Sequence, residues 1–179
     1  GYGVATRVEF FSLAAINALS SVIAPFVGQN IGARQITRVK HGFAVSLYFS
    51  LAIGLGLFVV YLFLADSIAS LFNDDSRVIS VAALYLRIVS VSFAAQGFYL
   101  VANSGLNVLK RPFHAAGLSL MELFGIAIPF ALLGTLFFGV TGVFLAVALS
   151  YTATGVVAWI VIKRVLSRYE RPETKKLHG

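Results

Sequence analysis

Long runs without a charged residue alternate with short charged segments along the 179-residue chain. A helix needs roughly 20 apolar residues to cross the hydrocarbon core of a bilayer, so each of the first three runs predicts one span. The fourth run is about twice that length, and the glycines in "FFGVTGV" predict a break within it. The four runs are residues 10–33, 42–65, 88–109 and 123–162.

These runs predict an all-α fold, a polytopic helical membrane bundle with five transmembrane helices. We expect the bundle to cover residues 1–166 and a polar cytoplasmic tail to cover residues 167–179. Pro25 should kink or end the first helix, and Pro129 should kink the fourth. The five spans are expected at about 5–28, 42–65, 78–109, 113–138 and 142–164.

Composition supports this class and excludes several kinds of site. The chain is 59% apolar with a mean hydropathy of +0.89, and 12% of its residues are charged, against about 25% in soluble domains. It has no cysteine, which excludes a disulfide or a thiolate nucleophile. The sequence contains no nucleotide-binding Gly-Lys loop, no Ser-His-Asp set and no metal-ligand spacing, so we expect no enzyme, cofactor or metal site.

The distribution of basic residues predicts how the chain is oriented. Eleven of the 14 lysines and arginines lie in "ARQITRVK", "LKRPF" and "KRVLSRYERPETKK", which fall on one side if the five spans alternate. The other side holds "LADSIASLFNDDSR", with three acidic residues and one arginine. This asymmetry predicts a multi-pass protein of the plasma (inner) membrane with a cytoplasmic C-terminus. The net charge of +7 therefore indicates topology and contact with the lipid bilayer, and not nucleic acid.

The same topology bears on what precedes Gly1. Five spans with the C-terminus inside place residue 1 outside, yet no initiator methionine or basic signal-peptide region leads into the first span. We therefore expect at least one further span upstream.

Small residues recur at every fourth position of the fifth predicted span. Such a ridge lets helix backbones approach closely in a membrane, so we interpret it as a packing surface. Its members are Gly142, Ala146, Ser150, Thr154 and Ala158.

A polar stripe runs along the third predicted span. Its members are spaced by four, three, four and four residues, which places them on one helix face. The stripe either forms hydrogen bonds to another helix or lines a water-filled cavity. Its members are Ser92, Gln96, Tyr99, Asn103 and Asn107.

Three ionisable residues lie within the predicted spans. Glu9 shares a face with Ser12, with Asn17 at its edge, and lies at a depth similar to that of Arg87. Glu9 therefore either pairs with Arg87 or binds a cation. Glu122 either exchanges a proton or cation or is satisfied by an interior hydrogen bond.

Several segments in order resemble the multidrug and toxic compound extrusion (MATE) family of secondary transporters. "YGVATRVEFF" leads into "APFVGQNIGARQ", and "LYLRIVSVSF", "GLNVLKRP" and "GVTGVFLAVALS" follow. The resemblance covers essentially the whole chain. It implies two six-helix lobes around a central cavity, with this chain as the eighth to twelfth helices and the N-terminal lobe as its missing partner.

The resemblance implies cation-coupled antiport that exports cationic amphipathic drugs or toxic compounds, with Na⁺ or H⁺ as the coupling ion. The alternatives are a flippase for a lipid-linked polysaccharide or peptidoglycan precursor and a non-transporting membrane scaffold. The resemblance also implies a structural loop formed by Gly28, Gln29, Asn30 and Gly32. The candidate residues for binding substrate or cation are Glu9, Ser12, Asn17, Gln96, Tyr99, Asn103, Asn107 and Glu122.

Overall fold

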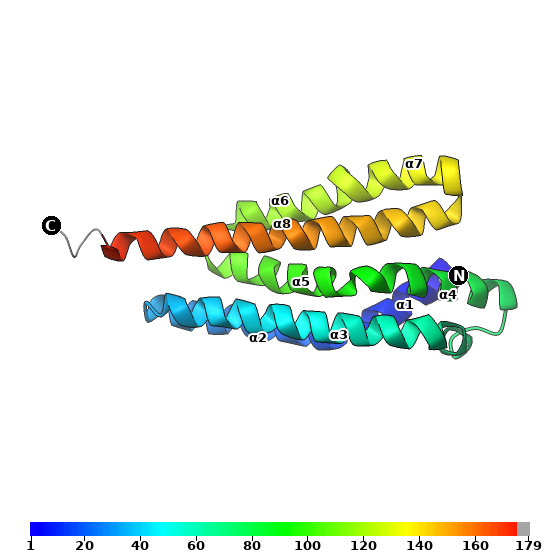
Figure 1. Ribbon diagram of the computed structural model, residues 1–179, viewed down its shortest axis with the longest axis horizontal. Helices are drawn as coiled ribbons and strands as arrows, with labels where there is room; N and C mark the ends of the chain where they lie inside the picture. The colour runs from blue at the N-terminus through cyan, green and yellow to red at the C-terminus, as the bar shows by residue number, and fades with distance from the viewer. Residues whose placement is uncertain (175–179) are drawn as a thin grey trace.

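The computed structural model describes residues 1–174 and shows an elongated bundle of helices (Figure 1). Within the described residues, five helical stretches are long and apolar enough to cross a membrane. The predicted all-α bundle with five transmembrane helices is therefore confirmed. The five stretches are Ala14–Gly32, Ile36–Ser70, Ser76–Val108, Pro112–Phe138 and Val140–Tyr169.

The first predicted span is divided into two helices, α1 (Tyr2–Ser12) and α2 (Ala14–Gly32). They meet at Leu13, directly after Ser12, whose hydroxyl donates to the Val8 carbonyl at 2.6 Å. A serine that bonds back to the preceding turn bends a helix, which accounts for an interruption at this position. Pro25 does not end the helix, since α2 continues through it.

The second predicted span is one long helix, α3 (Ile36–Ser70), whereas the third is interrupted. There, α4 (Ser76–Val89) and α5 (Phe93–Val108) are joined by a 3-10 turn, η1 (Ser90–Ser92). The hydroxyls of its two serines donate to carbonyls three residues earlier, at 3.4 and 2.7 Å. This spacing matches the tighter winding of a 3-10 turn.

The fourth predicted span is interrupted by a π-helical segment, η2 (Met121–Ala127), between α6 (Pro112–Leu120) and α7 (Ile128–Phe138). Pro129 lies in the first turn of α7 and has no N–H to donate to the preceding turn, which loosens the helix there. The predicted disturbance therefore lies just before the proline.

The last helix, α8 (Val140–Thr174), is longer than predicted. The helix continues into the expected polar tail as far as Thr174, and the boundary between bundle and tail stays a prediction. The rest of that tail, residues 175–179, lies outside the described residues.

The predicted structural loop is wrong, because all four of its residues belong to the last turns of α2. Asn30 is buried, and its side-chain amide donates to the Phe26 carbonyl at 2.8 Å. The chain turns only after Gly32, where Arg34 adopts a left-handed conformation with φ of 57°. Its backbone N–H donates to the Ile31 carbonyl at 3.0 Å and so closes the helix end.

Helix α5 lies at the centre of the bundle, with α2, α3 and α8 packed along it (Figure 1). Glycines allow two of these approaches. A Cβ at Gly54 of α3 would collide with the Ala94 backbone, and one at Gly155 of α8 would lie 2.5 Å from the Ala95 carbonyl oxygen. The adjacent residues Ala94 and Ala95 of α5 therefore lie directly against the backbones of α3 and α8.

The predicted ridge of small residues on α8 is confirmed. Its last four members are at most 3% exposed, and its first, Gly142, lies against the backbone of Gly134 on α7. Small side chains therefore set the spacing of α8 from its neighbours.

The basic segments gather at one end of the bundle, as predicted. The α2–α3 turn, the α5–α6 turn and the C-terminal part of α8 lie together at the left of Figure 1, and the acidic α3–α4 connection lies at the right. The charge asymmetry of the sequence is therefore an asymmetry between the two ends of the molecule.

Gly54→Ala should lower the stability of the full-length protein by about 1–3 kcal/mol, because the added methyl group forces α3 away from α5. Gly56→Ala is the matched control on the same helix, since a Cβ there meets nothing within 4 Å. The measurement is the thermal unfolding midpoint of both variants in detergent. Equal midpoints would contradict the close approach of α3 to α5.

Candidate functional site

Glu9 lies on α1 and is only 7% exposed. The Tyr85 hydroxyl of α4 donates to its Oε2 at 2.6 Å, and Tyr151 of α8 lies within interaction range of the same side chain. The Tyr85 ring is fixed in turn by edge contacts with the rings of Tyr2 and Phe144, at centroid distances of 5.5 and 5.1 Å. Three helices therefore hold one carboxylate.

The expected ion pair between Glu9 and Arg87 is wrong. The Arg87 guanidinium instead bonds to the Asp66 carboxylate near the end of α3. Residues two apart on a helix project to nearly opposite sides, so Arg87 points away from Glu9 when Tyr85 faces it. The neighbours of Glu9, which are Ser12, Tyr85 and Tyr151, carry no charge.

Glu122 lies on η2 and is half-buried. Tyr99 and Gln96 of α5 both lie within interaction range of its side chain. A carboxylate can only accept, so the Gln96 amide and the Tyr99 hydroxyl are the groups that can donate to it when Glu122 is ionised. The Tyr99 hydroxyl also shares a 2.8 Å hydrogen bond with Ser119 of α6, which positions it beside Glu122.

Tyr151 lies near both carboxylates. Its side chain lies within interaction range of both Glu9 and Glu122. A pocket of about 360 Å³ opens beside Glu122 and Tyr151, with Tyr2 and Ser119 in its wall. We call these six side chains the glutamate cluster: Glu9, Tyr85, Gln96, Tyr99, Glu122 and Tyr151.

The predicted polar stripe divides between the cluster and its surroundings. Gln96 and Tyr99 are buried at 8% and 5% exposure and join the cluster. Asn103 is half-buried, and Asn107 is exposed and donates to the Asn103 carbonyl at 3.0 Å. The Ser92 hydroxyl donates to the carbonyl of Val89, the last residue of α4. Among the described residues, the side-chain oxygens of Gln96 and Asn103 are buried without a protein donor.

Two further predicted site residues lie elsewhere. The Ser12 hydroxyl turns to α3 and bonds to the Tyr61 hydroxyl. Asn17 is half-buried on α2, and within the described residues no hydrogen bond joins it to either glutamate. The structure therefore brings together four of the eight predicted cavity residues: Glu9, Gln96, Tyr99 and Glu122.

Sequence reasoning missed Tyr85, Ser119 and Tyr151. Tyrosine is usually found at the membrane interface, where its hydroxyl reaches water. Tyr85 and Tyr151 instead lie well inside predicted spans, and a buried tyrosine hydroxyl needs a partner. That mismatch was the signal that could have found them.

The interruptions of the helices lie close to this site. Glu9 is in the last turn of α1 before Leu13, Glu122 is inside η2, and η1 separates Tyr85 from Gln96 along the third span. Broken or π-helical segments are common at transporter binding sites, because they free backbone groups and allow helices to bend. The described residues contain no cluster of three His, Cys, Asp or Glu side chains that could hold a metal.

Comparison with known proteins identifies the family. The family model described as MatE matches residues 1–133, about three quarters of the chain. The chain belongs to the MATE family of transporters. It is therefore part of a multi-pass membrane transporter and not of an enzyme.

Several relatives agree with this assignment. The chain is 30% identical over 164 residues to a protein of Shewanella oneidensis called an FAD transporter, covering 92% of this chain and 36% of that protein. The Vibrio cholerae MATE transporter VcmN in its bent form matches with a TM-score of 0.90 and 27% identity, over 94% of this chain and 38% of VcmN. A point mutant of VcmN matches with a TM-score of 0.88 and 28% identity, over 93% of this chain and 38% of the mutant. The chain thus spans little more than a third of each relative, in agreement with part of one MATE lobe.

Tyr85→Phe should destabilise the full-length MATE protein by about 1–3 kcal/mol, because the Glu9 carboxyl loses a donor that water cannot replace. In a Glu9→Leu background the same change should be neutral or stabilising, since the hydroxyl then has no acceptor. Tyr48→Phe, at an exposed position of α3, is the control. The wild type, Tyr85→Phe, Glu9→Leu and the double variant form a double-mutant cycle, measured by their thermal midpoints. Additive effects would exclude the coupling between Tyr85 and Glu9.

Proposed function

We propose that this chain forms part of a cation-coupled antiporter and that the glutamate cluster is its cation site. The observation that supports the proposal most is that Glu9 and Glu122, which come from different segments, both lie near Tyr151, which lines one pocket with Glu122. Two like charges repel strongly where water is excluded, so binding one H⁺ or Na⁺ between them relieves that repulsion. The buried oxygen of Gln96 adds a neutral ligand for the same cation.

The position of the cluster supports coupling to a conformational change. Its members come from α1, α4, α5, η2 and α8; the first three adjoin a helix interruption, and η2 is itself one. A bend at Leu13 or within η2 changes the distance between the glutamates and hence their affinity for a cation. Substrate and coupling ion then exchange because they compete for the same negative charge, which is the logic of antiport.

The leading substrate class is cationic amphipathic compounds, including drugs and toxic compounds. The pocket beside Glu122 combines a carboxylate with the rings of Tyr2 and Tyr151, and such a wall attracts organic cations by charge and by cation–π contact. FAD is the second candidate, favoured by the 30% identical relative that carries that name. FAD bears phosphate charge, and the described pocket wall contains no lysine or arginine, so FAD would need basic residues elsewhere in the full-length protein.

The same electrostatics argue against a flippase for a lipid-linked precursor. That activity needs cationic side chains for a pyrophosphate, and Arg87 is already paired with Asp66. A scaffold without transport has no use for two repelling carboxylates in a membrane. We also place the protein in the plasma membrane with the basic end in the cytoplasm.

Glu9→Gln and Glu122→Gln should each lower efflux by about tenfold or more, the effect of losing an interaction worth over ~1.4 kcal/mol. The measurement is ion-driven efflux of a fluorescent organic cation, and separately of FAD, at matched abundance of the full-length protein. Asp74→Asn, in the exposed α3–α4 connection, is the control. Unchanged efflux of both substrates by Glu9→Gln and Glu122→Gln would exclude the cluster as the cation site.

Arg38→Cys should be protected from a membrane-impermeant thiol reagent added outside cells, whereas Asp74→Cys should react, because the basic end faces the cytoplasm. Both positions are exposed, at opposite ends of the bundle, and this chain contributes no other cysteine. Any cysteines elsewhere in the full-length protein are replaced first. The reverse labelling pattern would invert the proposed orientation.

A further inference from the structure

A second recess lies between α3 and α8 and shares no lining residue with the pocket beside Glu122. It consists of two hollows, of about 550 and 270 Å³, that have Leu47, Phe98 and Trp159 in common. The two hollows therefore adjoin and form one groove along the bundle. We call it the α3/α8 groove.

The groove exists because α3 and α8 both pack along α5 and scarcely touch each other. Gly54 and Gly155 bring the two helices onto the adjacent Ala94 and Ala95 of α5, so the floor between them is made of small side chains. Phe98 and Ala94 lie on the face of α5 opposite Gln96, away from the glutamate cluster. The groove opens on the outside of the bundle.

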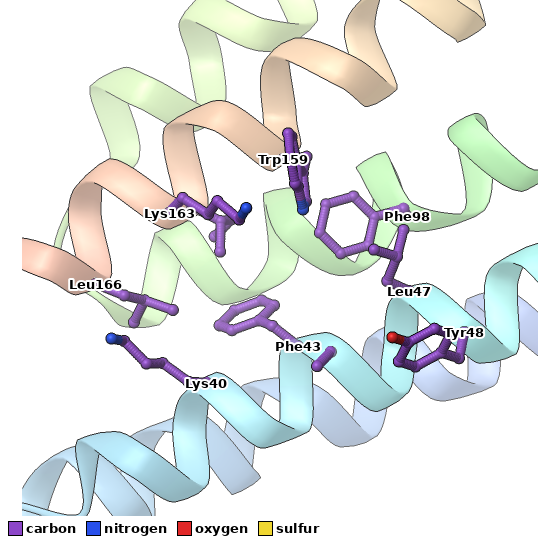
Figure 2. A pocket seen from close by; sticks show the side chains of 10 residues that line it. Lys40, Phe43, Leu47, Tyr48, Phe98, Trp159, Lys163 and Leu166 are labelled. Atoms are coloured by element: carbon purple, nitrogen blue, oxygen red, sulfur yellow. The ribbon is translucent and has the colours of Figure 1, made fainter.

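The two ends of the groove differ in chemistry. Lys40 of α3 and Lys163 of α8 lie at the basic end of the bundle, and Figure 2 shows them on facing helices beside Leu166 and Trp159. The Lys163 ammonium lies 3.7 Å from the centre of the Trp159 ring. Toward the middle of the bundle the lining becomes apolar, with Leu51, Val91 and Val156.

We propose that the α3/α8 groove is a binding site for one anionic phospholipid. Lys163 binds the phosphate, Trp159 lies at the level of the glycerol backbone, and one acyl chain fills the apolar part. Basic pockets between membrane helices on the cytoplasmic side recognise anionic head groups, and tryptophan favours the interface. This inference concerns a surface that the proposed transport mechanism does not use.

The length of the groove fits one leaflet. From Lys163 to Thr152, α8 rises roughly 16 Å at about 1.5 Å per residue. Half of the ~30 Å hydrocarbon core is about 15 Å. A phosphate at Lys163 therefore places the end of its acyl chain near Thr152, close to the middle of the bilayer.

The lipid should also link α3 to α8, which meet mainly through α5. Binding at the groove therefore raises the stability of the bundle, and it does so more for an anionic than for a zwitterionic head group. The difference in affinity between the two lipids reports on the contribution of Lys163. The affinity that both lipids share reports on the apolar part of the groove.

The test is native mass spectrometry of the purified full-length protein with phosphatidylglycerol and phosphatidylcholine at equal concentrations. We expect one tightly bound phosphatidylglycerol in the wild type. Lys163→Gln should weaken its binding about fivefold, the effect of one cation near a lipid phosphate, and weaken phosphatidylcholine less, because the choline ammonium offsets its phosphate charge. Lys110→Gln, exposed at the same end but outside the groove, should change neither.

Thr152→Phe separates the acyl part of the site from the head-group part. Thr152 is an exposed side chain in the apolar hollow, so the larger ring should fill the hollow without disturbing the fold and weaken both lipids. Equal wild-type binding of the two lipids, or equal losses in Lys163→Gln and Lys110→Gln, would overturn the proposal. A disulfide-linked dimer of a Val156→Cys variant would overturn it in favour of a second copy of the chain.

Discussion

The bilayer offers no hydrogen bond to the Glu9 carboxyl, so the protein itself must supply each one. Tyr85 donates one and Tyr151 lies close by, and both come from helices that are distant from α1 in the sequence. Tyr85 requires α4 to pack against α1, and Tyr151 requires α8 to lie within reach of both. The arrangement of the bundle around α1 therefore follows from the burial of one ionisable group.

The packing of α3 and α8 against α5 depends on glycines. Without Gly54 and Gly155, α3 and α8 could not approach the α5 backbone, and Gln96 and Tyr99 would not lie beside Glu122. The same close approach leaves α3 and α8 apart on the outer face, where the groove forms. The interior site and the outer groove are thus two consequences of how α5 is packed.

The sequence predicted the number of helices, their order and the end that carries the basic loops, because each follows from charge-free length and from charge position. It also predicted Glu9, Gln96, Tyr99 and Glu122, because polar groups in a span must face the interior. It did not predict which side chains from different helices pair with each other. Depth along a helix suggested Arg87 as the partner of Glu9, but depth does not give the direction in which the side chain points, and Arg87 meets Asp66. The helix interruptions at Leu13 and in η2 depend on serine hydroxyls and on the bond missing at Pro129, which apolar periodicity does not reveal.

The central claim is that Glu9 and Glu122 form one shared cation site and not two independent ones. The most direct test is the number of cations released when the purified full-length transporter binds its substrate, measured for the wild type and for Glu9→Gln and Glu122→Gln separately. A shared site predicts one cation released by the wild type and none by either single variant. Release that persists in one variant, or that falls in independent steps, would contradict the account.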